Sequence, residues 1–110
     1  MAKYLTIGYG DRSGYDRTPE QLRTAAHEQD KRLREAGALI GIAGAPVQVR
    51  NTLGNQIETK NGAFLSSDLP VAGFAIIDAE DISEAIEMVA KTPCAIAYGV
   101  VEVWPIEGTR

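Results

Sequence analysis

His27 and Asp30 are the first candidates for chemistry in this sequence. His27 is the only histidine among the 110 residues, and histidine is the side chain whose ordinary pKa lies nearest neutrality, so general acid–base work falls to it first. Asp30 follows one helical turn later, where its carboxylate would stabilise a charged imidazole. Two interpretations stay open: an acid–base or ligand-orienting group at a pocket edge, or a solvated histidine within a surface pattern of charges.

Aromatic and acidic residues on the first and last predicted strands are candidates for contact with a ligand. Aromatic walls with a few polar groups are typical of small-molecule pockets. The alternative is that the aromatic residues pack in the core or between subunits. Glu102 is a pocket carboxylate, the partner of an arginine such as Arg50, or a group on an edge that faces water. These candidates are Tyr4, Tyr9, Tyr98, Glu102 and Trp104.

Metal, nucleotide and disulfide sites are not indicated. Cys94 is the only cysteine, which excludes an intrachain disulfide and favours a small apolar filler over a nucleophile. One histidine without a nearby cluster of ligands argues against a tight transition-metal site. The glycines at residues 8–10 and 41–44 lack the spacing and the lysine of a phosphate loop. We therefore predict neither a metal nor a cofactor.

Composition and charge restrict the class of protein. The length predicts a single domain over residues 1–110. Hydrophobic residues make up 45% and charged residues 24%, as in a soluble globular protein. The net charge of −4 argues against nucleic-acid binding, and no apolar run approaches the roughly 20 residues of a membrane span. Without a signal-peptide pattern, a cytoplasmic location is expected.

The helix that carries His27 has start and stop signals. Thr18 followed by Pro19 predicts an N-cap and a first helical residue. Gly37 predicts the C-cap of a helix that runs to about Ala36. At about 100° per residue, His27 lies away from the apolar stripe of this helix. That stripe consists of Leu22, Ala25, Ala26, Gln29, Leu33 and Ala36.

Strands on either side of this helix complete two βαβ units. A polar, glycine-bearing loop is expected over residues 10–17. Asp81, with Glu84 three residues on, predicts the start of a second helix, and Pro93 fixes its end. Strands are predicted over residues 3–9, 38–43, 71–77 and 98–104, and a hairpin pairs 47–50 with 56–59. This order predicts an α+β, ferredoxin-like βαββαβ fold with an inserted β-hairpin.

One face of such a sheet stays uncovered in a single subunit. The continuously apolar segment 71–77 predicts a central strand buried on both faces. An apolar uncovered face predicts a second subunit, and therefore a homodimer. On the last strand the uncovered face holds one of two sets, either Tyr98, Val100, Glu102 and Trp104 or Gly99, Val101 and Val103.

Taken together, these segments resemble the YciI-related family, and more closely its DGPF branch. The resemblance covers nearly the whole chain and rests on the order and spacing of its motifs. These are KYLTIGYGD at residues 3–11, His27, REAGAL at 34–39, GFAIID at 73–78 and YGVVEV at 98–103. The resemblance implies a ferredoxin-like subunit that dimerises sheet to sheet as a dimeric α+β barrel. His27 matches the helical histidine that the YciI branch pairs with an aspartate.

The sequence departs from the family's pattern at three places. The loop that names the DGPF branch reads NGAF at residues 61–64, the aspartate of the pair is replaced by Thr92, and a typical arginine near the end of the last strand is Trp104. A threonine cannot be the ionised partner of His27, so the family's pair is not intact.

Two functions are consistent with this resemblance. In the first, the protein binds a small organic molecule in an apolar pocket and acts on it without a cofactor, with His27 in proton transfer. Isomerisation, elimination and hydrolytic dehalogenation all suit such a site. In the second, a protein of the same fold binds a small ligand or a partner and catalyses nothing. Turnover distinguishes the two.

Overall fold

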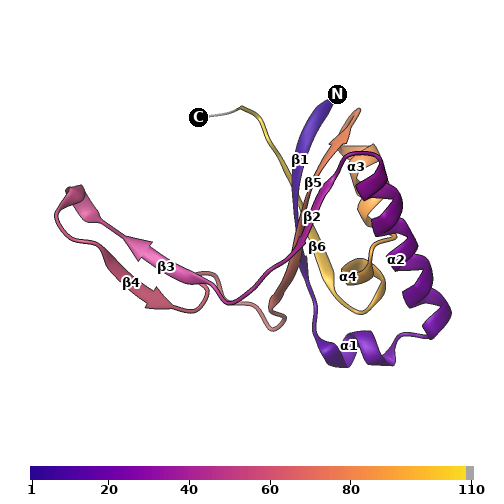
Figure 1. Ribbon diagram of the computed structural model, residues 1–110, viewed down its shortest axis with the longest axis horizontal. Coiled ribbons are helices and arrows are strands. Elements are labelled where there is room, and N and C mark those ends of the chain that lie inside the picture. Colours follow the sequence, from indigo (N-terminus) through magenta and orange to yellow (C-terminus); the bar gives the residue numbers. More distant parts are fainter. Residues whose placement is uncertain (109–110) are drawn as a thin grey trace.

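The computed structural model describes residues 1–108, which form a four-stranded antiparallel sheet with helices on one face (Figure 1). The strands lie in the order β2 (Leu39–Ile42), β5 (Val71–Ala79), β1 (Ala2–Tyr9) and β6 (Val100–Pro105). Helices connect β1 to β2 and β5 to β6. This arrangement confirms the α+β, ferredoxin-like prediction. No helix among the described residues is long and apolar enough to cross a membrane.

The first connection contains a helix that the sequence analysis missed. Residues 10–17 were predicted to be a loop, but Arg12–Arg17 form helix α1. Asp11 caps it, because its carboxylate accepts a hydrogen bond from the backbone N–H of Gly14 at 2.8 Å. Thr18 closes the same helix by donating its hydroxyl to the carbonyl of Gly14, also at 2.8 Å. The predicted role of Thr18 as N-cap of the next helix is therefore wrong.

Helix α2 (Glu20–Glu35) follows directly, after Pro19. Gly37 has φ +106°, which confirms it as the C-terminal cap. The predicted apolar stripe was only half right. Ala26, Gln29 and Leu33 are buried, whereas Leu22, Ala25 and Ala36 are exposed. The helix is rotated toward α3 (Ile82–Val89), where the Gln29 amide donates to the carbonyl of Met88 at 2.8 Å.

The second connection consists of two helices rather than one. Asp81 caps α3 through the backbone N–H of Glu84 at 2.9 Å, as predicted. Helix α3 ends at Val89, and Pro93 opens a further short helix, α4 (Pro93–Ile96). Proline suits the first residue of a helix because that position needs no N–H donor. The prediction that Pro93 ends the second helix was therefore wrong.

The core lies between the sheet and α3, toward one end of the helix-covered face. Its buried members are Tyr4, Ala75, Ile77, Ala79, Ala85 and Val89. Alternate residues of β5 are buried here, but Phe74 is exposed on the other side of the strand. The prediction that this strand is buried on both faces was wrong for the single chain, because helices cover only one side of the sheet.

The opposite side of the sheet, called the open face below, carries exposed and half-exposed apolar residues. Val101 and Val103 pack toward the core, which leaves the alternate positions of β6 on the open face. Tyr98 precedes the strand because its φ of +62° is left-handed rather than extended. The open face is formed by Leu5, Ile7, Tyr9, Leu39, Phe74, Ile76, Val100, Glu102 and Trp104.

The inserted hairpin stands apart from this sheet. Strand β3 (Val47–Arg50) pairs with β4 (Glu58–Asn61), which confirms the hairpin but shifts its second strand by two residues. A single turn of 3₁₀ helix, η1 (Thr52–Gly54), lies between them. Residues 43–70, called the arm below, leave the ends of β2 and β5 and extend away from the helices (Figure 1).

Candidate functional site

A cavity open to solvent, of about 920 Å³, lies between α2, α4 and the helix-covered face of the sheet, and its lining also includes Phe74 of β5. Small residues on the strands make room for it. Gly8 and Gly73 line it, further along the strands that carry Tyr4 and Ile77 in the core. Helix α4 packs closely against β1 at this point, because a Cβ added at Gly8 would lie 2.8 Å from the sulfur of Cys94.

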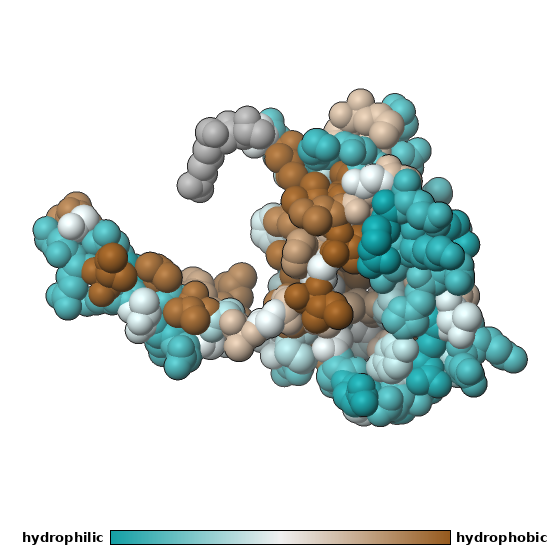
Figure 2. Space-filling view, in the orientation of Figure 1, coloured by the Kyte–Doolittle hydropathy of each residue, from teal (hydrophilic) through white to brown (hydrophobic). Residues whose placement is uncertain are grey.

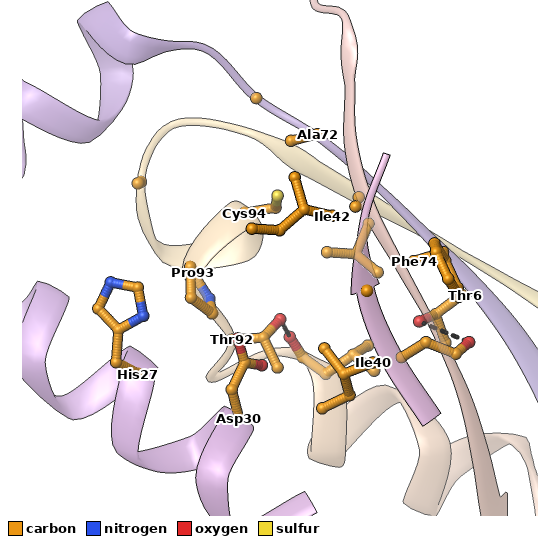
Figure 3. Close-up of a pocket in the computed structure, with 18 of the residues that line it drawn as sticks. Thr6, His27, Asp30, Ile40, Ile42, Ala72, Phe74, Thr92, Pro93 and Cys94 are labelled. Atoms are coloured by element: carbon orange, nitrogen blue, oxygen red, sulfur yellow. Dashed lines mark hydrogen bonds between the residues drawn. The ribbon is translucent and has the colours of Figure 1, made fainter. Parts of the chain in front are cut away.

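His27 and Asp30 both line this cavity from successive turns of α2 (Figure 3). Asp30 is half-buried, and this burial raises the pKa of its carboxyl group above the ordinary value. The positive charges of His27 and Arg34 act in the opposite direction. A carboxylate whose desolvation makes it more basic, beside an imidazole and facing an apolar cavity, is suited to general acid–base chemistry.

Tyr15 fixes the imidazole from α1. Its hydroxyl oxygen lies 2.8 Å from Nε2 of His27, and the two rings meet edge to face with centroids 5.8 Å apart. The guanidinium of Arg23 lies over the Tyr15 ring, 5.1 Å from its centroid. The sequence analysis missed Tyr15 because it assigned this segment to a loop. Asp11 was the available signal, since aspartate is a preferred N-cap residue.

Thr92 and Cys94 bring the start of α4 to the same cavity. Thr92 lines the cavity that Asp30 also faces (Figure 3), and its hydroxyl donates to the carbonyl of Val89 at 2.6 Å. Burial, and then the charge of Asp30, raises the pKa of the Cys94 thiol. A thiol held in its protonated form is a poor nucleophile. Cys94 therefore contributes an apolar wall to the cavity.

The other five residues proposed from sequence do not line the cavity. Tyr4 is buried in the core. On the open face, the Tyr9 hydroxyl donates to Glu102 at 2.7 Å, and this hydrogen bond raises the pKa of Tyr9. Trp104 lies on the same face. Tyr98 lies beneath the guanidinium of Arg17, which is 4.1 Å from its ring centroid.

The residues around the cavity do not form an evident metal site. Among residues 1–108, no group of three or more histidine, cysteine, aspartate or glutamate side chains is placed to hold a metal ion. The polar groups of the cavity are instead a carboxylate, an imidazole, a phenol and arginines at its rim, Arg12 and Arg34. These groups can bind an anion and move protons.

Comparison with known proteins assigns the chain to a family. A family model described as the YCII-related domain matches residues 2–109. No curated protein matches the sequence. Thr92, compared above with an aspartate of the YciI branch, lines the same cavity as His27. Because the match spans almost the whole sequence, the chain belongs to the YCII-related domain family.

Proposed function

We propose that the cavity binds a small organic acid and that Asp30 and His27 move a proton on it. One observation carries this proposal: a half-buried carboxylate of raised pKa and the only histidine face the same cavity from adjacent turns of one helix. The carboxylate that the family places at position 92 is missing, and Asp30 lines the same cavity as that position (Figure 3). Asp30 takes over its role.

The reaction that fits these groups is a proton-transfer isomerisation. The Asp30 carboxylate takes a proton from a carbon next to the ligand's carbonyl, and the electron pair moves onto the carbonyl as an enolate. Protonated His27 then gives a proton to a second carbon of the ligand. Transfer of the first proton from Asp30 to His27 restores both groups. No electrons are gained or lost, so this step needs no redox partner.

The walls of the cavity indicate the class of ligand. Its volume of about 920 Å³ is within the range of small-molecule pockets. Ile40, Val89 and Val101 offer apolar surface to the body of a ligand. Arg34, one turn beyond Asp30 on α2, also lines the cavity and would receive a carboxylate. An unsaturated carboxylic acid or a lactone that opens to one has both features.

Hydrogen exchange on a bound ligand tests this function. A panel of unsaturated carboxylic acids and lactones is first screened for binding by ligand-observed NMR. Exchange of the hydrogen next to the carbonyl is then followed in D₂O. We expect Asp30→Asn to slow this exchange at least about 100-fold, the usual contribution of a general base, while binding changes only a few-fold.

Glu28→Gln provides the matched control, because Glu28 is an exposed carboxylate on the same helix and does not line the cavity. It should leave both binding and exchange unchanged. Exchange that persists in the Asp30→Asn protein would exclude Asp30 as the base. Binding without exchange in the unmodified protein would contradict catalysis and favour a ligand-binding protein of the same fold.

The open face supports a second part of the proposal, a homodimer formed sheet to sheet. Trp104 is 51% exposed and Val100 53% exposed in the single chain, on a surface that is largely apolar apart from Glu102 and the Lys3–Asp78 ion pair. We expect Trp104→Glu to weaken self-association in sedimentation experiments, and Leu22→Glu on the outer side of α2 to leave it unchanged. Equal sedimentation of the two variants and the parent protein would contradict this interface.

The unpaired Cys94 suits a reducing compartment, the cytoplasm.

A further inference from the structure

The arm, residues 43–70, is an isolated hairpin with exposed apolar side chains that a second protein surface would cover. Among the described residues, its two strands pair with each other and with no strand of the four-stranded sheet. An isolated two-stranded hairpin is at best marginally stable in water. Six of its large apolar side chains are more than half exposed, Leu53 to 90%. They are Val47, Val49, Leu53, Ile57, Phe64 and Leu65.

The two sides of the hairpin differ in polarity. Val47 and Val49 share one side with Asn61 and Thr59, their partners across the hairpin. The other side carries Gln48, Arg50, Glu58 and Lys60. This alternation is typical of a hairpin that lays one side on a protein surface and turns the other to water. In the single chain the apolar side has no such surface.

The position of the arm indicates which surface it meets. It leaves the sheet on the side opposite the helices (Figure 1), which is the side of the open face. Figure 2 shows apolar side chains on the arm and on the body on either side of an open space. A second sheet stacked on the open face would occupy that space. The arm is therefore placed beside any subunit that docks there.

We propose that the arm is exchanged between two copies of this chain, so that the apolar side of each arm lies on the body of the other subunit. The proposal rests on the sheet-to-sheet dimer proposed above. In a twofold dimer each contact occurs twice, so both apolar arm sides and both open faces are covered at once. No different partner is needed to bury either surface.

The length of the arm fits this exchange. Stacked sheets lie about 10 Å apart, and a helix layer packs roughly a further 10 Å behind a sheet. Residues 43–53, from the base of the arm to its tip, reach up to about 35 Å when extended. The arm is thus long enough to pass the edge of the partner's sheet and reach its helix layer. The chain as a whole measures 52 × 36 × 20 Å, and the arm lies along the longest dimension (Figure 1).

Self-association of arm variants tests the exchange. Val47 and Val49 are exposed in the single chain, so changing both to Asp does not threaten the fold of the body. We expect this double variant to raise the dimer dissociation constant at least about 100-fold in sedimentation equilibrium, because each of the two arms loses two apolar anchors. Gln48→Asp is the control, because it adds a charge on the other side of the same strand. It should leave the dissociation constant within about threefold.

Hydrogen exchange of the arm's backbone amides gives a second, independent measurement. If the arms are exchanged, the amides of β3 and β4 become protected as the protein concentration rises through the dissociation constant. The double variant should lose this protection, and so should Trp104→Glu, which disrupts the open face. A stable dimer with unprotected arms, or a double variant that associates like the parent, would overturn the exchange while leaving the sheet-to-sheet dimer intact. Protection that is independent of concentration would place the arm on its own body and also overturn it.

These outcomes are separable from the catalytic proposal. Ligand binding and exchange of the ligand's hydrogen are measured on the same samples, and neither is used to score the arm. A protein that remains monomeric at every concentration would overturn both the dimer and the exchange of arms. It would leave Asp30 and His27 to be judged by their own variants.

Discussion

The two ends of the helix-covered face are built on the same strands, yet one is packed and the other is hollow. At the core end β1 contributes Tyr4 and β5 contributes Ile77, which is only 1% exposed. Toward the other end the same strands carry Gly8 and Gly73, and the cavity lies there. The backbone arrangement is shared, so side-chain size decides which end has room for a ligand.

The contrast extends to the polar groups. Gln29, on the packed side of α2, donates its amide to a backbone carbonyl and is satisfied there. Asp30, the next residue, points into the cavity, where burial raises the pKa of its carboxyl group. One position along the helix thus separates a polar group that is hydrogen-bonded to the backbone from a carboxyl group that faces the cavity.

The largest expected effect is a loss of stability at the packed end. Ile77→Ala leaves a cavity where the side chain is fully enclosed, and should lower the free energy of unfolding by about 2–4 kcal/mol in urea denaturation. Ile42→Ala at the hollow end is the control, because Ile42 is 92% exposed, and should cost less than about 0.5 kcal/mol. Similar losses at the two positions would show that the two ends are not packed differently.

Filling the cavity should weaken ligand binding without loss of stability. Ala72→Leu adds volume at the cavity wall, so ligand affinity should fall at least about tenfold, equivalent to 1.4 kcal/mol, while thermal stability stays nearly constant. Ala45→Leu, an exposed position on the arm, should change neither. Unaltered affinity in titration calorimetry of Ala72→Leu would show that the ligand binds elsewhere.

Removal of the Tyr15 hydroxyl tests whether its contact with His27 positions the imidazole. Tyr15→Phe loses the contact of 2.8 Å to His27, so the rate of hydrogen exchange on the ligand should fall about 3- to 10-fold, as for a typical hydrogen bond of about 1 kcal/mol. Ligand affinity should be unchanged, and the imidazole resonances of His27 should shift in NMR spectra.

Tyr98→Phe removes a hydroxyl from a ring that does not line the cavity. It should leave both the rate and the resonances unaltered. If the two variants behave alike, Tyr15 does not orient His27.

The smallest expected effect concerns Asp30 and stability. Its folded-state pKa is raised by burial, so the group favours the fold most below its ordinary pKa. That contribution is lost as pH rises through the raised value. Asp30→Asn should therefore stabilise the protein at pH 7, by no more than about 0.5 kcal/mol because the side chain is only half-buried. In the Asp30→Asn protein, the free energy of unfolding should also depend less on pH just above the ordinary carboxyl pKa. Lower stability of the variant at pH 7 would contradict the burial effect.

The fold was predictable because its signals are local. The alternation on β1, the Asp81 cap and the Gly37 terminator each depend on a few neighbouring residues, and all three are present in the structure. Helix α1 was missed because it is short and its cap, Asp11, lies in a segment rich in glycine and charge. Pro93 was misassigned because a proline fits equally well after one helix or at the start of the next.

The candidate site was predictable only in part. His27 and Asp30 were found because both lie on one helix at a spacing that makes neighbours. Tyr15 and Cys94 reach the same cavity from other elements, and their approach depends on how α1 and α4 pack. The aromatic residues of the outer strands were selected by type. Which side of a strand each would face depends on register and on the side that the helices cover, and neither was available from residue type.

The contact between Gly8 and Cys94 constrains how this sequence can change over generations. A methyl group at position 8 would lie 2.8 Å from the sulfur, so an alanine there requires the Cys94 side chain to move or position 94 to become smaller. The order of the two substitutions then matters, because only a change at position 94 first avoids the steric clash. Relatives that carry alanine at position 8 should accordingly carry glycine or alanine at position 94, and the two positions should co-vary.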